Sequence, residues 1–196
     1  GGTAPAVNNG SGASSIGLTY AVLNGTVTAG NTAPYVWIYR GTTNGTTTDK
    51  TSWNLGGVAL GQQAGAFSTF VSCSSNQTYW YRAYASNEVG EAWAPASSNF
   101  TTAIVTISPA SQSVQEGITN VPVTFTVTLS TNVNVPVSVV YQTAAGTATN
   151  GDYSGTTNSV VIPAGSTTAQ FTVNVVGDTT YEPMKYFYVD LTSATT

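Results

Sequence analysis

The sequence predicts an all-β protein made of two antiparallel, immunoglobulin-like β-sandwiches in tandem. Apolar and polar residues alternate over many short stretches, and no stretch of useful length has helical periodicity. Turn signals such as NG, GG and PAG separate these stretches, as expected between sandwich strands. The chain has 196 residues, and domains of about 100 residues are usual. We therefore expect one domain over residues 1–102 and a second over 103–196.

The alternation is clearest in the second half of the chain. Residues 121–129 read VPVTFTVTL, with Val and Phe on one face of the predicted strand and Thr on the other. This period of two is typical of a strand with one buried face. The pattern recurs over residues 135–141, 171–175 and 187–191, and a turn at 163–165 separates a further predicted strand, around 160–162, from the stretch at 171–175. These stretches are predicted to be successive strands of one sandwich.

The first half shows the same pattern with more aromatic residues. Its apolar stretches are bounded by Gly and Asn, and they are rich in the β-branched and aromatic residues that strands favour. The predicted strands cover residues 18–27, 35–40, 67–71, 78–85 and 99–102.

Charge is scarce and unevenly distributed. Asp, Glu, Lys and Arg make up 6% of the residues, against roughly 25% in an average soluble protein. The second half holds five acids and a single base, Lys185, and so accounts for the whole net charge of −4. With four basic residues in the whole chain, we expect no binding to nucleic acid and none to an anionic membrane surface.

Several other classes are also disfavoured. No apolar stretch approaches the roughly 18 residues that a membrane span needs, and no signal peptide is evident, so we expect no membrane insertion. The chain has no histidine, which removes the usual catalytic triads and zinc sites, and we expect no enzyme. Cys73 is the only cysteine and is expected to be a small buried apolar residue.

Four of the five acids in the second half lie in predicted connections between strands, next to Gly or Pro. Such loops meet at the ends of a sandwich, and carboxylates are the ligands that Ca²⁺ prefers. If like charges gather there, a bound cation is expected to offset their repulsion. The alternative is that they are solvated loop acids, with Lys185 in a surface ion pair. The candidate calcium ligands are Glu116, Asp152, Asp178 and Glu182.

The second half also resembles a Calx-beta domain. The motifs in order are VQEG at 114–117, VTFTVTLS at 123–130, VPVSVVYQTAAGTATNGDY at 135–153, VIPAGSTTAQFTV at 161–173, and GDTTYEP ahead of FYVDL. The resemblance implies a seven-stranded sandwich that binds calcium at one end, with the four acids named above at ligand positions. Two features depart from the family. Lys185 stands where a further acid is usual, and the last strand is missing from this sequence.

The first half resembles a fibronectin type III domain over about residues 5–102. The resemblance rests on TYWYRAYASNEVGEAW and SSNFTT within residues 78–102, on LNGTV at 23–27 and on Trp53. It implies that Tyr79 forms a tyrosine corner, in which the hydroxyl bonds a nearby backbone group. Both resemblances are to domains found in large bacterial cell-surface proteins.

The favoured function is a non-enzymatic extracellular module with a structural or adhesive role, stabilised by calcium. A sandwich without its last strand exposes a sheet edge, so strand donation between copies or from a neighbouring domain could build a surface fibre or adhesin. The alternative is a module that binds a surface glycan or protein through loop tips and exposed aromatic residues. The four tryptophans, expected mainly in packing roles, are Trp37, Trp53, Trp80 and Trp93.

Overall fold

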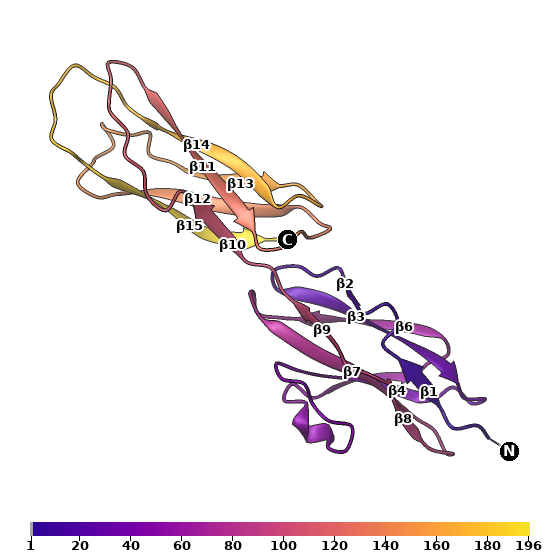
Figure 1. The fold of residues 1–196 in the computed structure, drawn as a ribbon. Helices are drawn as coiled ribbons and strands as arrows, with labels where there is room; N and C mark the ends of the chain where they lie inside the picture. Colours follow the sequence, from indigo (N-terminus) through magenta and orange to yellow (C-terminus); the bar gives the residue numbers. More distant parts are fainter. Residues whose placement is uncertain (1) are drawn as a thin grey trace. The chain divides into compact units, whose positions relative to one another are not determined.

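The computed structural model describes residues 2–196, which fold as strands joined by loops, with one short 3-10 turn, η1, at Lys50–Ser52 (Figure 1). The chain divides into two compact units. Unit 1 extends to Ala103, and unit 2 covers Ile104–Thr196. All sheets in the described residues are antiparallel, so the prediction of an all-β fold is confirmed.

Unit 1 is a sandwich of two sheets. In the first sheet β3 pairs with β1, β2 and β6, and in the second the order is β5-β4-β7-β8, with β9 also paired to β7. The first sheet consists of β1 (Ala6–Asn8), β2 (Ala13–Ser14), β3 (Tyr20–Ala29) and β6 (Ala66–Ser72). The second consists of β4 (Tyr35–Gly41), β5 (Gly57–Gln62), β7 (Thr78–Ser86), β8 (Glu91–Trp93) and β9 (Ser98–Thr101).

The core of unit 1 lies between these two sheets. Alternate residues of β3, β4 and β7 point inward, because successive side chains of a strand point to opposite faces. Leu23, Val36, Ile38 and Tyr81 are fully buried there. The Tyr81 hydroxyl donates to the backbone oxygens of Asn9 and Asn24, each at 3.2 Å, so its buried polar atom is satisfied.

The buried side chain of Asn9 fills a gap in the second sheet of unit 1. β7 pairs with β9 over its first half and with β8 over its second half, and the chain between β8 and β9 leaves the ladder. In that gap Asn9 Oδ1 accepts from the backbone N–H of Ala83 at 2.9 Å. Its Nδ2 donates to the carbonyl of Ala96 at 2.9 Å and to Ser98 Oγ at 3.0 Å. Asn9 thus replaces the missing stretch of β-ladder.

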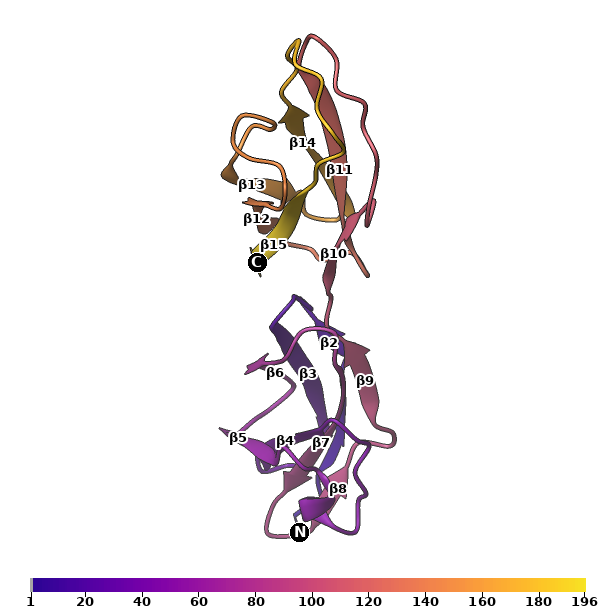
Figure 2. The ribbon, with the colours of Figure 1, turned by 90° about the vertical axis from the view of Figure 1, so that its left-hand side faces the viewer.

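Unit 2 is a sandwich of two three-stranded sheets, seen from a second direction in Figure 2. Their orders are β10-β11-β14 and β13-β12-β15. The strands are β10 (Val105–Ser108), β11 (Val121–Leu129), β12 (Val137–Ala145), β13 (Thr157–Ile162), β14 (Thr168–Val175) and β15 (Phe187–Thr195). These six strands are one fewer than the Calx-beta resemblance implies.

The core of unit 2 is built on the alternation that the sequence shows. Phe125 on β11 lies opposite Phe171 on β14, and their ring centroids are 5.5 Å apart. Tyr141 from β12 in the other sheet stacks on Phe171 with centroids 3.6 Å apart, so aromatic rings join the two sheets. Val137 and Val139 of β12 are completely buried beside them.

Candidate metal site

The first predicted ligand, Asp152, lies in the loop between β12 and β13, and backbone hydrogen bonds hold this loop against the end of β14. Its N–H donates to the carbonyl of Thr149 at 2.9 Å, which closes a turn. Its own carbonyl accepts from the N–H of Val176 at 2.9 Å, and the next residue, Tyr153, forms an isolated bridge with Val175. Asp152 is therefore placed beside the start of the β14–β15 loop.

The carboxylate of Asp152 has partners on both oxygens. Oδ2 accepts from the N–H of Thr149 at 2.6 Å and from its hydroxyl at 3.1 Å. Oδ1 accepts from Lys185 Nζ at 2.8 Å. Thr149, which the sequence analysis did not single out, thus orients the carboxylate. The signal that could have found it is the Thr-x-x-Asp spacing, a common pattern for a side chain that bonds the backbone of its own turn.

Lys185 also pairs with Glu182, so one ammonium group joins two carboxylates. The distance from Lys185 Nζ to Glu182 Oε2 is 2.6 Å. The side chains of Asp152, Glu182 and Lys185 are 17%, 24% and 26% exposed, so the cluster is partly shielded from water. The bonds to Lys185 and Thr149 hold the pKa of Asp152 well below its usual range. The bonds to Asp152 and Glu182 raise the pKa of Lys185 above its usual range.

The other two predicted ligands, Glu116 and Asp178, form a second, separate pair. Glu116 Oε1 accepts from the backbone N–H of Asp178 at 3.2 Å. Asp178 Oδ1 accepts from the N–H of Thr180, two residues later in the same loop, at 2.6 Å. Each carboxylate is bonded to a backbone N–H, a common arrangement for acids in loops.

The structure therefore divides the four predicted ligands into two pairs. Within residues 2–196 it shows no group of three or more His, Cys, Asp or Glu side chains close enough to hold a metal ion. Calcium takes six to eight oxygen ligands, and at Asp152 and Glu182 a lysine ammonium is the cation in contact with the oxygens. These two residues, as arranged, do not fit a calcium ion. Calcium bound by all four acids stays a prediction.

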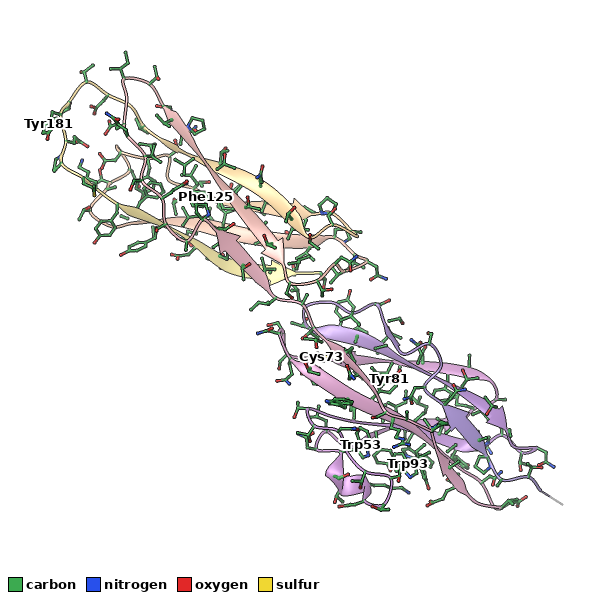
Figure 3. The ribbon with its side chains drawn as sticks, viewed as in Figure 1. Trp53, Cys73, Tyr81, Trp93, Phe125 and Tyr181 are labelled. Carbon is green, nitrogen blue, oxygen red and sulfur yellow. The ribbon has the colours of Figure 1, made fainter. Side chains whose placement is uncertain are left out.

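The aromatic residues of unit 1, the basis of the glycan-binding alternative, are largely committed to packing. Trp53 is 1% exposed, and its ring stacks on Trp93 with centroids 6.4 Å apart. Trp93 also contacts the rings of Tyr39 and Tyr84, at 5.1 and 4.9 Å. Figure 3 shows Trp53 and Trp93 side by side in the same part of unit 1. Tyr35 on β4 is 53% exposed, so its ring is more accessible to a ligand than those of Trp53 and Trp93.

Two further expectations concern Cys73 and the membrane. The sequence predicted a buried Cys73, whereas in the structure its side chain is only half-buried against the core of unit 1. This partial burial raises the pKa of the Cys73 thiol. Among residues 2–196, no helix has the length and apolar character that crossing a membrane requires.

The fold and the loops together define a class: a chain of antiparallel β-sandwiches, the second of which has four of its five acidic residues in the loops between its strands. Comparison with protein families refines this assignment for the second half of the chain. Residues 100–196 match the family model of the Calx-beta domain, so the resemblance found in the sequence is confirmed for unit 2. The fibronectin type III resemblance of unit 1 stays a prediction.

Two solved structures show a distant likeness to the whole chain. The crystal structure of CBD12 from CALX1.2 aligns with 13% sequence identity and a TM-score of 0.40, covering 96% of this chain and 80% of that chain. The crystal structure of calcium binding domain CBD12 of CALX1.1 aligns with 13% identity and a TM-score of 0.38, covering 90% and 74%. A comparison with curated proteins found no match.

Proposed function

We propose that this chain is a non-enzymatic structural or adhesive module of an extracellular protein, of the kind found in large bacterial surface proteins. In this proposal a fibronectin type III-like sandwich is followed by a Calx-beta sandwich. The match over residues 100–196 supports the second part. Support for the first comes from Tyr79 on β7, whose hydroxyl accepts from the N–H of Ser74 at 2.7 Å across the corner from β6. This is the arrangement of a tyrosine corner.

The observation that carries the proposal is the open edge of unit 2 at β15. β15 pairs with β12 on one side and is the last strand of its sheet. Its inward residues Val189 and Leu191 are half-buried, whereas Val137 and Val139 on the adjacent β12 are fully buried. The core is therefore less covered at this edge, and an added strand would bury more of it. Unpaired backbone groups at a sheet edge are a template for such pairing.

The strand that pairs with β15 comes, in our proposal, from another copy of this chain or from a neighbouring domain of a longer chain. Strand addition joins modules through backbone hydrogen bonds, and the side chains of the donated strand complete the apolar core. The scarcity of charge on this protein reduces repulsion between copies. Assembly of this kind would produce a surface fibre or a long adhesin.

The test places lysines on the exposed face of the open edge. Tyr188 and Thr192 are both exposed on β15, and lysine on an edge strand opposes pairing with another strand. A matched control makes the same change at Thr157 and Ser159, which are exposed on β13 at the opposite edge of the same sheet. Light scattering after gel filtration, followed by negative-stain microscopy, measures the size of the assemblies with and without calcium.

We expect the unaltered chain to associate as its concentration rises. The double variant Tyr188→Lys, Thr192→Lys should stay monomeric, and the double variant Thr157→Lys, Ser159→Lys should associate like the unaltered chain. A chain that stays monomeric at all concentrations would count against association between copies. Equal association of both double variants would show that β15 is not the interface.

A further inference from the structure

The cluster of Asp152, Glu182 and Lys185 carries a further inference, which is independent of the proposed adhesive role. We propose that Lys185 is the resident cation of this loop end. Its ammonium group takes the place between Asp152 and Glu182 that a bridging calcium ion would take. The loop end of unit 2 is then held in its fold without calcium, in contrast with the calcium stabilisation expected from the sequence.

The geometry makes the two cations mutually exclusive. Lys185 Nζ lies 2.8 Å from Asp152 Oδ1 and 2.6 Å from Glu182 Oε2. A calcium ion bound to the same two oxygens would lie about 2.3–2.6 Å from each, which places it within a few ångströms of the ammonium group. At such a distance the repulsion between the charges is strong. Only one of the two cations can therefore occupy this position.

The lysine also makes the mechanical link that a bridging ion would make. Asp152 belongs to the β12–β13 loop, whereas Glu182 and Lys185 belong to the β14–β15 loop. The ammonium group therefore ties two loops that are far apart in the sequence. Because its side chain is 26% exposed, the contact is screened less than a fully exposed ion pair.

Neighbouring hydrogen bonds hold the same two loops in place without a metal ion. The N–H of Ala148 donates to the carbonyl of Tyr186 at 2.9 Å. The N–H of Tyr186 donates to Thr147 Oγ1 at 3.1 Å. Thr149 bonds the second carboxylate oxygen of Asp152, so the orientation of this carboxylate does not depend on a cation alone. To hold the two loops together, the structure needs in addition only a positive charge that offsets the repulsion between the carboxylates of Asp152 and Glu182. Lys185 supplies that charge.

The experiment compares the full chain with variants at Lys185, using calcium itself as the probe. Isothermal titration to about 10 mM calcium covers the 10⁻⁴–10⁻³ M range of extracellular calcium modules. Hydrogen exchange read by mass spectrometry, in chelator and in calcium, reports on peptides spanning residues 146–153 and 176–186. The main variant, Lys185→Glu, replaces the cation by a third carboxylate. Lys50→Glu makes the same charge change in unit 1 and serves as the control.

For the unaltered chain we expect no saturable calcium binding and equal exchange protection of the two loops in chelator and in calcium. Lys185→Glu should lose protection in chelator, regain it with calcium and show saturable binding. The double variant Lys185→Glu, Asp152→Asn should lose that binding again. Lys50→Glu should behave like the unaltered chain.

Saturable binding to the unaltered chain, with increased protection of residues 146–153, would overturn the proposal. If Lys185→Glu does not fold, Lys185→Gln keeps the side-chain length without the charge. It should show lower protection of both loops in chelator, partly restored by calcium. A folded Lys185→Gln with protection equal to the unaltered chain in chelator would show that the ammonium does not hold the loops, and would also refute the proposal.

Discussion

Replacing Asn9 by alanine tests how the second sheet of unit 1 is completed. The side chain of Asn9 makes three hydrogen bonds in the gap between β8 and β9, to Ala83, Ala96 and Ser98. The substitution leaves the backbone of β1 in place and removes all three bonds. It therefore separates the contribution of this one side chain from that of β1, the strand that Asn9 directly follows.

The cost follows from the burial of the partners. A hydrogen bond contributes about 1 kcal/mol net, and a buried group left without a partner costs about 1–3 kcal/mol. Ala83 is completely buried, so its N–H loses its partner without access to water, whereas Ala96 is exposed and its carbonyl can be rehydrated. We expect Asn9→Ala to lower the free energy of unfolding of unit 1 by about 2–4 kcal/mol.

The assay is urea and thermal unfolding followed by tryptophan fluorescence. All four tryptophans lie before residue 104, so the signal reports on unit 1 alone. For a domain of this size a loss of about 3 kcal/mol lowers the melting temperature by about 12–24 °C. Asn8→Ala is the control, because within residues 2–196 the Asn8 side chain bonds only the nearby N–H of Gly10, which Oδ1 accepts at 2.8 Å. We expect that control to cost less than about 1 kcal/mol.

A loss below about 0.5 kcal/mol for Asn9→Ala, the usual effect of a surface substitution, would refute the reasoning. It would mean that water or a backbone shift satisfies Ala83 when the side chain is removed. An equal loss in Asn8→Ala would also contradict it, because the effect would then belong to β1 as a whole and not to the bonds of Asn9.

The remaining predictions concern pH and glycans. Burial raises the pKa of Tyr81 in the folded state, so the unfolded chain releases that proton first and stability falls as the pH rises above about 10. The urea midpoint of Tyr81→Phe should fall less between pH 7 and pH 11, and an equal fall in both proteins would contradict this. On a glycan array we expect no sugar binding that depends on Tyr35. If sugar binding is lost in a folded Tyr35→Ala variant, the result would favour the alternative function of glycan binding. Loss of sugar binding in Trp53→Ala would not distinguish the two functions, because removing this buried ring lowers the free energy of unfolding by about 3–5 kcal/mol.

The sequence was most informative where one face of a strand is buried. The predicted strand over residues 121–129 has the same bounds as β11, because its alternation extends over its full length. The strands β1, β2, β5, β8 and β10 were not predicted. Four of them, β1, β2, β8 and β10, have two to four residues each, and so few residues show no periodicity. The fifth, β5, has six residues, but two of them are glycines, which are depleted in strands. Nothing in the sequence around Asn9 indicated its role, since its partners are more than 70 residues away.

The features of the candidate metal site also divide into those that the sequence determined and those that only the tertiary structure decided. The sequence alone determined that acids are scarce, that four of them lie in loops of unit 2, and that Glu182 and Lys185 are three residues apart, close enough to pair locally. Only the tertiary structure decided that Lys185 also reaches Asp152, 33 residues earlier, while Glu116 bonds the backbone of Asp178 in a separate pair. The physical reason is that charge and local spacing are properties of the chain. Which loops meet, and which cation lies between their carboxylates, depends on how the two sheets pack.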